Sequence, residues 1–519
     1  MRSVMLHQFS QVPRAEIPRS SFDRSHGFKT TFDAGYLVPC FVDEALPGDT
    51  FHLRANAFGR LSTPLHPFMD NLMIDFFFFA VPIRLIWANF KRFFGEQDNP
   101  SDSTSFLVPQ LTTPAGGFLI GSLPDYMGVP TEVPNLKVNS LHFRAYNLIY
   151  NQWFRDENLI NSLPVPVNDG PDDPTQYSMV RRGKRHDYFT SGLPWPQKGP
   201  AVSIPLGSTA PVYGAGDMIP TFASIGATAT GLGGTPGTQN VIWGQNATGT
   251  GPAAWAEPKL HADLSVATAA TINQLRQAFQ IQKIYERDAR GGTRYTELIK
   301  SHFGVTSPDA RLQRAEYLGG GHANVSVNPI AQTSNVEAGP TPLGSLAAMG
   351  TVAKGGIGFS KSFTEHCVLI GLMSARADLT YQQGLNRMWS RQTRWDFYWP
   401  ALAHIGEQAV LNKEIFAQGT AVDDEVFAYQ ERFAEYRYKP SIVTGLFRST
   451  AAESLDTWHL SQHFATLPAL NQAFIEEHPP VQRVIAVTTE PHFLMDMYFQ
   501  LRCARPMPVY GVPGNIDRF

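Results

Sequence analysis

Two stretches of the chain carry residue types that bind nucleic acids or partner proteins. The first is Arg181-Arg182-Gly183-Lys184-Arg185, in which four cations lie within five residues. Clustered cations favour phosphate groups, so all four are candidates to face DNA. Arginine also predominates at packed protein interfaces, and for this basic run the sequence leaves both interpretations open.

The second stretch, Arg387–Trp399, alternates guanidinium groups with large aromatic rings. Its candidate contact residues are Arg387, Trp389, Arg391, Arg394, Trp395 and Trp399. Rings beside cations can stack on the bases of single-stranded nucleic acids. Tryptophan and arginine also dominate the energetics of protein interfaces. We therefore rank a subunit interface first for this stretch and nucleic-acid binding second.

Sequence patterns for catalysis and for metal binding are weak. The glycine clusters at 319–321 and 355–358 lack the spacing of phosphate-binding loops. Glu365-His366-Cys367 lacks the second histidine that a metalloprotease helix needs. Adjacent acids at 172–173, 423–425 and 476–477 are typical of solvated turns rather than of the facing carboxylates of a glycosidase. The sequence therefore predicts no catalytic residues, no metal site and no cofactor.

Composition narrows the class of protein further. Charged residues make up 17% of the 519 residues, against a usual share of about 25%, which indicates a surface that partly faces other subunits. The net charge of −3 gives no global attraction to nucleic acid. The three isolated cysteines suit a reducing compartment. No signal peptide is predicted, and the apolar run that ends at Trp87 contains Asp75 and Arg84, which argues against membrane insertion.

The elements that must position these residues are predicted to be mostly strands. Asn71–Val81 contains four consecutive phenylalanines, and we expect a strand buried on both faces. Apolar and polar residues alternate over 28–38, 51–57 and 493–503, as in half-buried strands. Further core strands are expected at 367–373 and 484–487.

A core strand just before the C-terminus favours a jelly roll, in which the last strand returns between the first and the third. Residues 493–503 should then pair with both 32–38 and 73–81. The predicted fold class is mainly β: an eight-stranded jelly-roll sandwich with long inserted loops and a few short helices. Amphipathic spacing predicts helices over 271–287 and 296–303.

The predicted organisation has four parts. Residues 1–29 form an extended arm, 30–130 the first part of the strands, 131–355 the inserted loops and helices, and 356–519 the remaining strands and the tail. The insert includes a loop over about 199–260, because Met218–Ala256 has no ionisable side chain. A solvated linker is normally charged, so we expect this loop to pack on itself or on neighbouring copies, with a plain flexible linker as the alternative.

Several longer motifs resemble the major capsid protein of the gokushovirus branch of the microviruses. They are Ile17–His26, Pro64–Asn71, Arg182–Thr190, Leu193–Gln197, Tyr285–Tyr295, Ser307–Arg314 and Cys503–Tyr510. The resemblance implies a jelly-roll subunit of a T=1-type icosahedral shell around the circular single-stranded DNA of a bacteriophage, and no enzyme activity. It also implies a virion location, assembly in the cytoplasm of the host bacterium, and a small basic DNA-binding protein inside the shell.

In that family a variable inserted loop forms protrusions at the threefold axes, and here the uncharged loop is the candidate for contact with a host receptor. The residues assigned to it are Thr230, Gly233, Gly234, Trp243, Asn246 and Trp255. A carbohydrate-binding or carbohydrate-cleaving jelly-roll protein is the alternative from another class, motivated by the nine tryptophans and the acidic pairs. A non-structural protein that binds single-stranded DNA is a third possibility.

Overall fold

The computed structural model describes residues 18–200, 202, 272–306, 313–333 and 343–510, together with the backbone of short strands between 212 and 262. The chain divides into two compact units, one formed by residues 1–196 and 291–519 and the other by residues 197–290. The larger unit contains every candidate residue except those of the uncharged loop.

Two antiparallel sheets dominate the larger unit. The first sheet has the strand order β1-β21-β4-β17-β16, and β2 also pairs with β21. Its strands are β1 (Ser20–Asp23), β2 (His26–Phe32), β4 (Thr50–Leu61), β16 (Ser326–Ala331), β17 (Leu346–Ser362) and β21 (Phe493–Arg505). The second sheet has the order β15-β5-β18-β3. Its strands are β3 (Val38–Ala45), β5 (Leu72–Pro82), β15 (Glu316–Asn324) and β18 (Cys367–Ala377).

Smaller elements decorate these sheets. The larger unit also contains two short ribbons and several helices: β6 (Gln110–Thr112) with β7 (Lys137–Asn139), β19 (Glu407–Leu411) with β20 (Val426–Glu431), and α1 (Phe90–Phe93), α2 (Leu123–Tyr126), α3 (Leu141–Ile149), α5 (Tyr295–Phe303), α7 (Asn412–Ile415) and α8 (Gln472–Ile475). The smaller unit contains α4 (Ile272–Arg290), β8 (Val212–Gly214), β9 (Thr221–Ser224), β10 (Thr230–Gly231), β11 (Gly233–Gly234), β12 (Val241–Ile242), β13 (Ala253–Glu257) and β14 (Leu260–Ala262). The chain is thus mainly β, with antiparallel sheets and a few short helices.

The main core contains side chains from both sheets. Every second residue of β4 and β21 is buried, so each strand directs one apolar face toward the core. From the first sheet, the Phe499 ring lies 5.4 Å from the ring of Phe41 in the second. Fully burying such a ring stabilises the fold by about 1.5–3 kcal/mol, so the alternating phenylalanines are the principal source of cohesion between the sheets.

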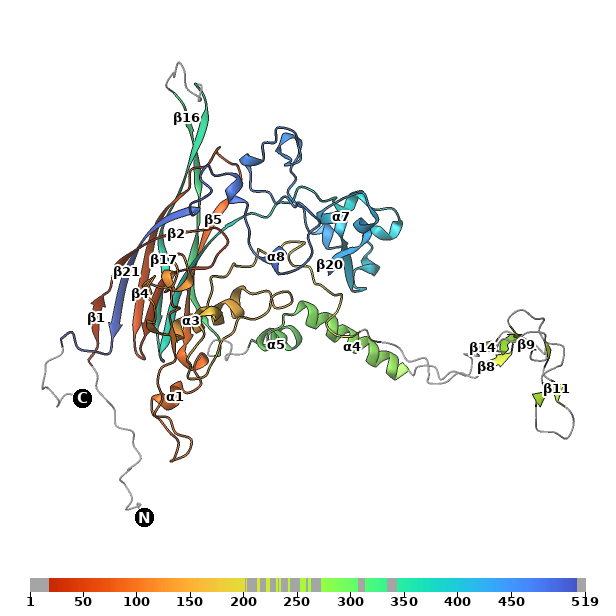
Figure 1. Ribbon diagram of the computed structural model, residues 1–519, viewed down its shortest axis with the longest axis horizontal. Coiled ribbons are helices and arrows are strands. Elements are labelled where there is room, and N and C mark those ends of the chain that lie inside the picture. Colours follow the sequence, from red (N-terminus) through yellow and green to blue (C-terminus); the bar gives the residue numbers. More distant parts are fainter. Residues whose placement is uncertain are drawn as a thin grey trace, which may run out of the picture. The chain divides into compact units, whose positions relative to one another are not determined.

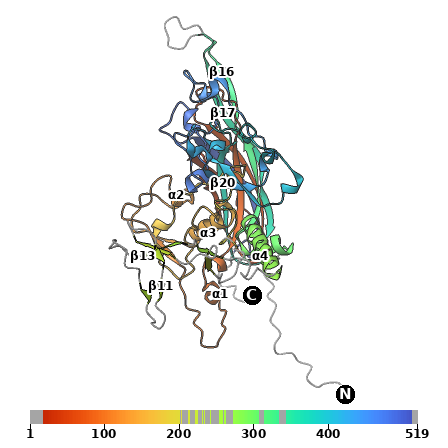
Figure 2. The ribbon, with the colours of Figure 1, turned by 90° about the vertical axis from the view of Figure 1, so that its right-hand side faces the viewer.

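A second core covers the other side of β5. Phe79 and Val81 point away from the first sheet and pack with Phe143 and Tyr146 of α3. The phenylalanine strand is therefore buried on both faces, as its composition predicts, because it has a sheet on one side and α3 with its loops on the other. Figure 1 shows α3, α8 and β20 on one side of the two-sheet stack, whereas β21 and β4 of the first sheet form the opposite side. In both ribbon views, β16 and the start of β17 extend beyond the rest of the larger unit (Figure 2).

The predicted pairing of 493–503 with 73–81 is wrong. β21 pairs with β4, with Phe499 opposite Ala55, whereas β5 lies between β15 and β18 in the second sheet. Alternation identifies a strand with one buried face, but it does not specify which similar strand continues the ladder.

The predicted strand over 28–38 is interrupted. β2 ends at Phe32 and β3 begins at Val38, so that Pro39 lies inside a strand rather than after one. Between them Gly35 has a φ of +88°, a turn conformation that glycine adopts readily. The partner of β21 is accordingly 26–32 rather than 32–38, with Phe28 opposite Met497.

The prediction of a strand at 484–487 is also wrong. A short 3-10 turn covers Val481–Arg483, and Ile485 makes only an isolated bridge with Pro64. Val484 and Ile485 are nevertheless buried. Ala486 and Val487 are exposed, so the apolar run indicated burial for only its first two residues and did not indicate conformation.

Strands at 51–57, 71–81, 367–373 and 493–503 and helices at 271–287 and 296–303 are confirmed, with differences only at their ends.

Candidate functional site

The first two cations of the basic run point into the larger unit. The Arg181 guanidinium lies 4.0 Å from the centre of the Tyr36 ring and donates to the backbone oxygen of Ala34 at 3.1 Å. Arg182 forms an ion pair with Asp75 at 2.6 Å. This pairing brings the loop that contains the basic run onto β5.

Asp75 has a second cationic partner. Arg376 of β18, which is only 1% exposed, binds the same carboxylate oxygen at 2.6 Å. Burial acts to raise the pKa of Asp75, but the hydrogen bonds from Arg376 and Arg182 outweigh it and hold that pKa below its ordinary value. The carboxylate is therefore an ionised link between the two strands and the basic run.

Lys184 is also buried. Its Nζ atom donates to the backbone oxygen of Phe474 at 2.6 Å, and its charge interacts electrostatically with Glu477, which is 1% exposed. Burial lowers the pKa of Lys184 to about 8 and raises that of Glu477 to about 7. Only Arg185 of the four cations is exposed. Contact of the run with DNA stays a prediction, and Arg185 is the member with an accessible charge.

In the aromatic stretch, Arg387 and Arg391 point inward, whereas Arg394 is exposed. Arg387 donates to the backbone oxygen of Ala409 at 2.7 Å and pairs with Glu414 at 2.9 Å. Arg391 pairs with Glu435 at 3.5 Å and lies 4.2 Å from the centre of the Tyr436 ring. These contacts fix the path of a segment that contains only short 3-10 turns.

The rings of this stretch point outward. We call Trp389, Trp395, Phe397, Tyr398, Trp399 and Tyr436 the aromatic surface; each of these side chains is 47 to 72% exposed. Arg394 packs its guanidinium 4.0 Å from the centre of the Trp395 ring, and the Trp399 indole donates to the Arg394 backbone oxygen. Trp395 and Trp399 are thus held in place while about half of each side chain stays exposed. Ordered, exposed rings are typical of protein interfaces, and the interface role of this surface stays a prediction.

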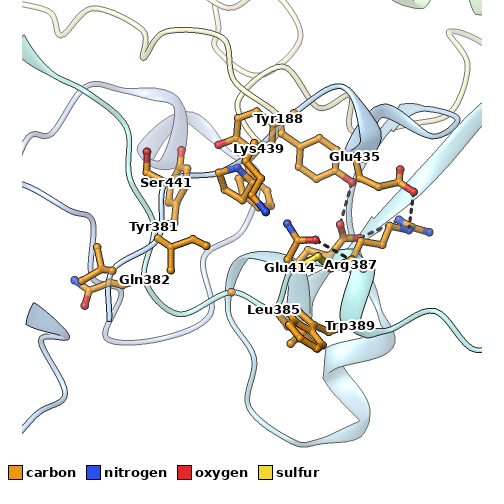
Figure 3. A pocket seen from close by; sticks show the side chains of 18 of the residues that line it. Tyr188, Tyr381, Gln382, Leu385, Arg387, Trp389, Glu414, Glu435, Lys439 and Ser441 are labelled. Carbon is orange, nitrogen blue, oxygen red and sulfur yellow. Dashed lines mark hydrogen bonds and ion pairs between the residues drawn. The ribbon is translucent and has the colours of Figure 1, made fainter. Parts of the chain in front are cut away.

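A cavity of about 250 Å³ lies beside this surface, and Figure 3 shows its lining. Glu414 accepts hydrogen bonds from Arg387 and from the Tyr188 hydroxyl at 2.9 Å. Burial raises the pKa of Glu414. Arg387 also lies within 4.0 Å of Glu435. The carboxylates are therefore engaged in holding loops together, and this arrangement does not resemble the two free groups of a glycosidase.

The other acidic clusters also have structural roles. Asp172 pairs with Arg144, whose side chain is 0% exposed, and Asp423 accepts from the backbone nitrogens of Gln418 and Gly419. Among the described residues, no group of three or more histidine, cysteine or acidic side chains is arranged to hold a metal ion. Nor does the described part of the chain contain a helix long and apolar enough to cross a membrane.

Four of the residues assigned to the protrusion loop lie in the smaller unit's short strands. Thr230 belongs to β10, Gly233 and Gly234 to β11, and Trp255 to β13. Trp243 and Asn246 lie outside the described residues. Their role in protrusion and receptor contact stays a prediction.

Sequence reasoning missed two parts of this arrangement. Tyr436 joins the aromatic surface from a separate loop, and no local pattern around it indicates this. The inward direction of Arg182 depends on Asp75, which is distant in sequence. The acid inside the strongly apolar segment 71–81 was the available signal, because a buried carboxylate needs a cationic partner.

An open set of rings on a mainly β unit, without an arrangement of catalytic groups among the described residues, is typical of a structural protein that binds other chains. Comparison with known sequences identifies the family to which the chain belongs. Residues 10–515 match the family described as "Capsid protein (F protein)". The chain is 51% identical to Capsid protein VP1 of Bdellovibrio phage phiMH2K, with 99% of this chain and 98% of the relative covered.

It is 46% identical to Capsid protein VP1 of Chlamydia phage 1 (99% and 98% covered). The identity is 38% to Capsid protein VP1 of Spiroplasma virus 4 (98% and 97% covered). The chain belongs to the F-type capsid protein family. The resemblance to gokushovirus capsid proteins is confirmed, and the chain is a structural component of the virion rather than an enzyme.

Proposed function

We propose that copies of this chain assemble through the aromatic surface into a T=1-type icosahedral shell around circular single-stranded DNA. The observation that carries the interface is the exposure of six large rings on one subunit, with their neighbouring arginines already paired. Burying such rings between copies removes apolar area from water, and closure of the shell makes many modest contacts cooperative.

The eight longest strands of the two sheets support a jelly roll. Leaving out β1 and the β16 extension, the strand orders are β2-β21-β4-β17 and β3-β18-β5-β15. If these eight strands are numbered one to eight along the chain, the first sheet has the order one, eight, three, six. The second sheet has the order two, seven, four, five. The last strand thus lies between the first and the third, as expected for this fold.

The partners follow from charge and from the insert. A chain with a net charge of −3 neutralises little of a genome, so a small basic protein inside the shell is part of the proposal. The loop over about 199–260 is proposed as the outer protrusion that contacts a host receptor. Assembly takes place in the bacterial cytoplasm.

Replacing Trp395 and Trp399 with alanine tests the interface. Truncating an interface hot spot costs about 2 kcal/mol or more per site, so the double variant should remain a folded subunit and fail to form particles at concentrations where the unmodified chain assembles. Negative-stain microscopy and sedimentation measure assembly, and circular dichroism measures folding.

The matched control replaces Phe303 and Tyr510, which are 79% and 84% exposed and lie outside the aromatic surface. Normal particles from the Trp395/Trp399 variant would refute the interface assignment. A stable monomer from the unmodified chain would refute the shell.

A further inference from the structure

The two sheets of the larger unit differ in what covers them. The side of β5 and β18 that faces away from the core packs under α3 and its loops. On the opposite side, alternate residues of β4 and β21 are exposed along the full length of both strands. We call this side of the first sheet the bare face; its exposed residues are His52, Arg54, Asn56, Phe58, Arg60, Leu494, Asp496, Tyr498, Gln500 and Arg502.

Two rings project from the middle of the bare face. Tyr498 is 48% exposed and Phe58 is 47% exposed. Tyr498 has Asn56 opposite it on β4 and Gly27 opposite it on β2. Gly27 has no side chain, and a Cβ atom added to it would meet nothing closer than 3.9 Å, so the position on β2 beside Tyr498 is open. A planar group could therefore reach the Tyr498 ring and stack on it.

Two shallow hollows flank these rings. One, of about 720 Å³, is lined by residues including Lys29, Phe58 and Arg60; the other, of about 750 Å³, is lined by residues including Arg54 and Tyr498. They contact successive parts of β21, which is 13 residues long and therefore spans about 40 Å at 3.3 Å per residue. The bare face offers an extended track rather than a compact pocket.

The charge of this track is positive after its internal pairs are removed, because Asp125, an acid that lines the first hollow, is outnumbered by two unpaired arginines. Asp496 is paired with Lys29 at 2.9 Å, and Asp23 lies opposite Arg502 in the strand register. Arg54 and Arg60 have no ion-pair partner among the described residues, and the Arg60 guanidinium lies 5.9 Å from the centre of the Phe58 ring. Two free guanidinium groups thus accompany two open rings.

We propose that the bare face binds single-stranded DNA, with phosphates at Arg54 and Arg60 and bases stacked on Tyr498 and Phe58. This proposal deepens, and rests on, the function proposed above. The inserted layers cover the opposite side of the larger unit, and we assign the uncovered bare face to the inner surface of a shell one subunit thick. Ring stacking tolerates any base, which suits a packaged genome.

Single-stranded DNA explains the combination better than a neutral glycan. Rings with neighbouring amides would suit either ligand, but unpaired guanidinium groups along an extended track favour a polyanion. The basic run, in contrast, has three of its four cations engaged inside the subunit.

The first experiment uses the purified full-length subunit and a fluorescein-labelled oligothymidine. The variant combines Arg54→Ala, Arg60→Ala and Tyr498→Ala. Its affinity should fall at least about tenfold, because base stacking and two phosphate contacts are lost. The slope of log affinity against log salt should become shallower by about 1.4, at about 0.7 for each single-strand phosphate contact. Tyr498→Phe, which keeps the ring, should bind like the unmodified chain.

The matched control combines Lys137→Ala, Lys300→Ala and Tyr510→Ala, which removes the same charge and one exposed tyrosine elsewhere. Unchanged affinity in the bare-face variant would overturn the proposal. An equal loss in the control would also overturn it, because net charge alone would then explain binding. Circular dichroism confirms that both variants are folded.

Assembled particles separate this proposal from the shell itself. The bare-face variant should form shells of normal size that protect less DNA from nuclease. Shells with full DNA content would overturn the bare-face assignment. Failure of the unmodified chain to form shells would overturn the proposed function, whereas the oligonucleotide measurement on the subunit would still decide whether this face binds DNA.

Discussion

Replacing Asp75 with asparagine is expected to destabilise the subunit strongly. Asp75 neutralises Arg376, whose side chain is 1% exposed, and Arg182, whose side chain is 14% exposed. The asparagine amide keeps the size of the side chain but removes its charge, so two buried guanidinium groups lose their counterion. Breaking a buried ion pair on one side costs about 3–5 kcal/mol, and we expect a loss of that size in the free energy of unfolding.

The same substitution elsewhere provides the control. Asp496 also pairs with a cation, Lys29, but the two side chains are 54% and 77% exposed. Exposed pairs contribute about 0–1 kcal/mol, so Asp496→Asn should have little effect.

Urea unfolding of the purified subunit, followed by tryptophan fluorescence and circular dichroism, measures both variants against the unmodified chain. The expected result is a large decrease in the urea midpoint for Asp75→Asn alone. Similar midpoints for the two variants would show that the Asp75 cluster contributes no more than a surface pair, and would refute the reasoning.

Two further substitutions test the buried charges and the core. Burial raises the pKa of Glu477 to about 7, so the stability contributed by its protonated form is complete below the unfolded pKa of about 4.3 and is lost as the pH rises through 7. Glu477→Gln should therefore make the melting temperature fall less between pH 5 and 7.5; an unchanged pH profile would contradict this. Phe78→Ala should lower the free energy of unfolding by about 3–5 kcal/mol, because Phe78 is 1% exposed. Phe58→Ala, at a site that is 47% exposed, should lower it far less, and urea unfolding measures both. Equal costs would contradict the placement of Phe78 in the core.

Strand positions could be predicted because burial leaves a local pattern. The alternation over 493–503 and the four phenylalanines of β5 both reflect a requirement to keep apolar side chains from water. Pairing between strands could not be predicted, because β4 and β5 are both apolar strands and either could pair with β21 through its backbone. The choice depends on the three-dimensional path of the whole chain.

The sequence predicted which residues form the candidate sites, but not which of their side chains point outward and which point into the subunit. The outward rings of Arg387–Trp399 agree with an interface. The basic run was expected to have accessible cations, yet Arg182 and Lys184 meet Asp75 and Phe474, which come from distant segments. The bare face was missed because its rings and cations are scattered over two strands and are neighbours only in the sheet.

The central place of β21 in the first sheet has a consequence for synthesis. Of the strands in the two sheets, β21 leaves the ribosome after all the others, yet it inserts between β2 and β4, which leave it among the first. Until residue 505 is available, the sheet has a gap in its middle and β4 has an unpaired edge. A polypeptide that ends before residue 493 therefore cannot complete the first sheet, and the strand pairings of highest sequence separation form only after β21 has been made.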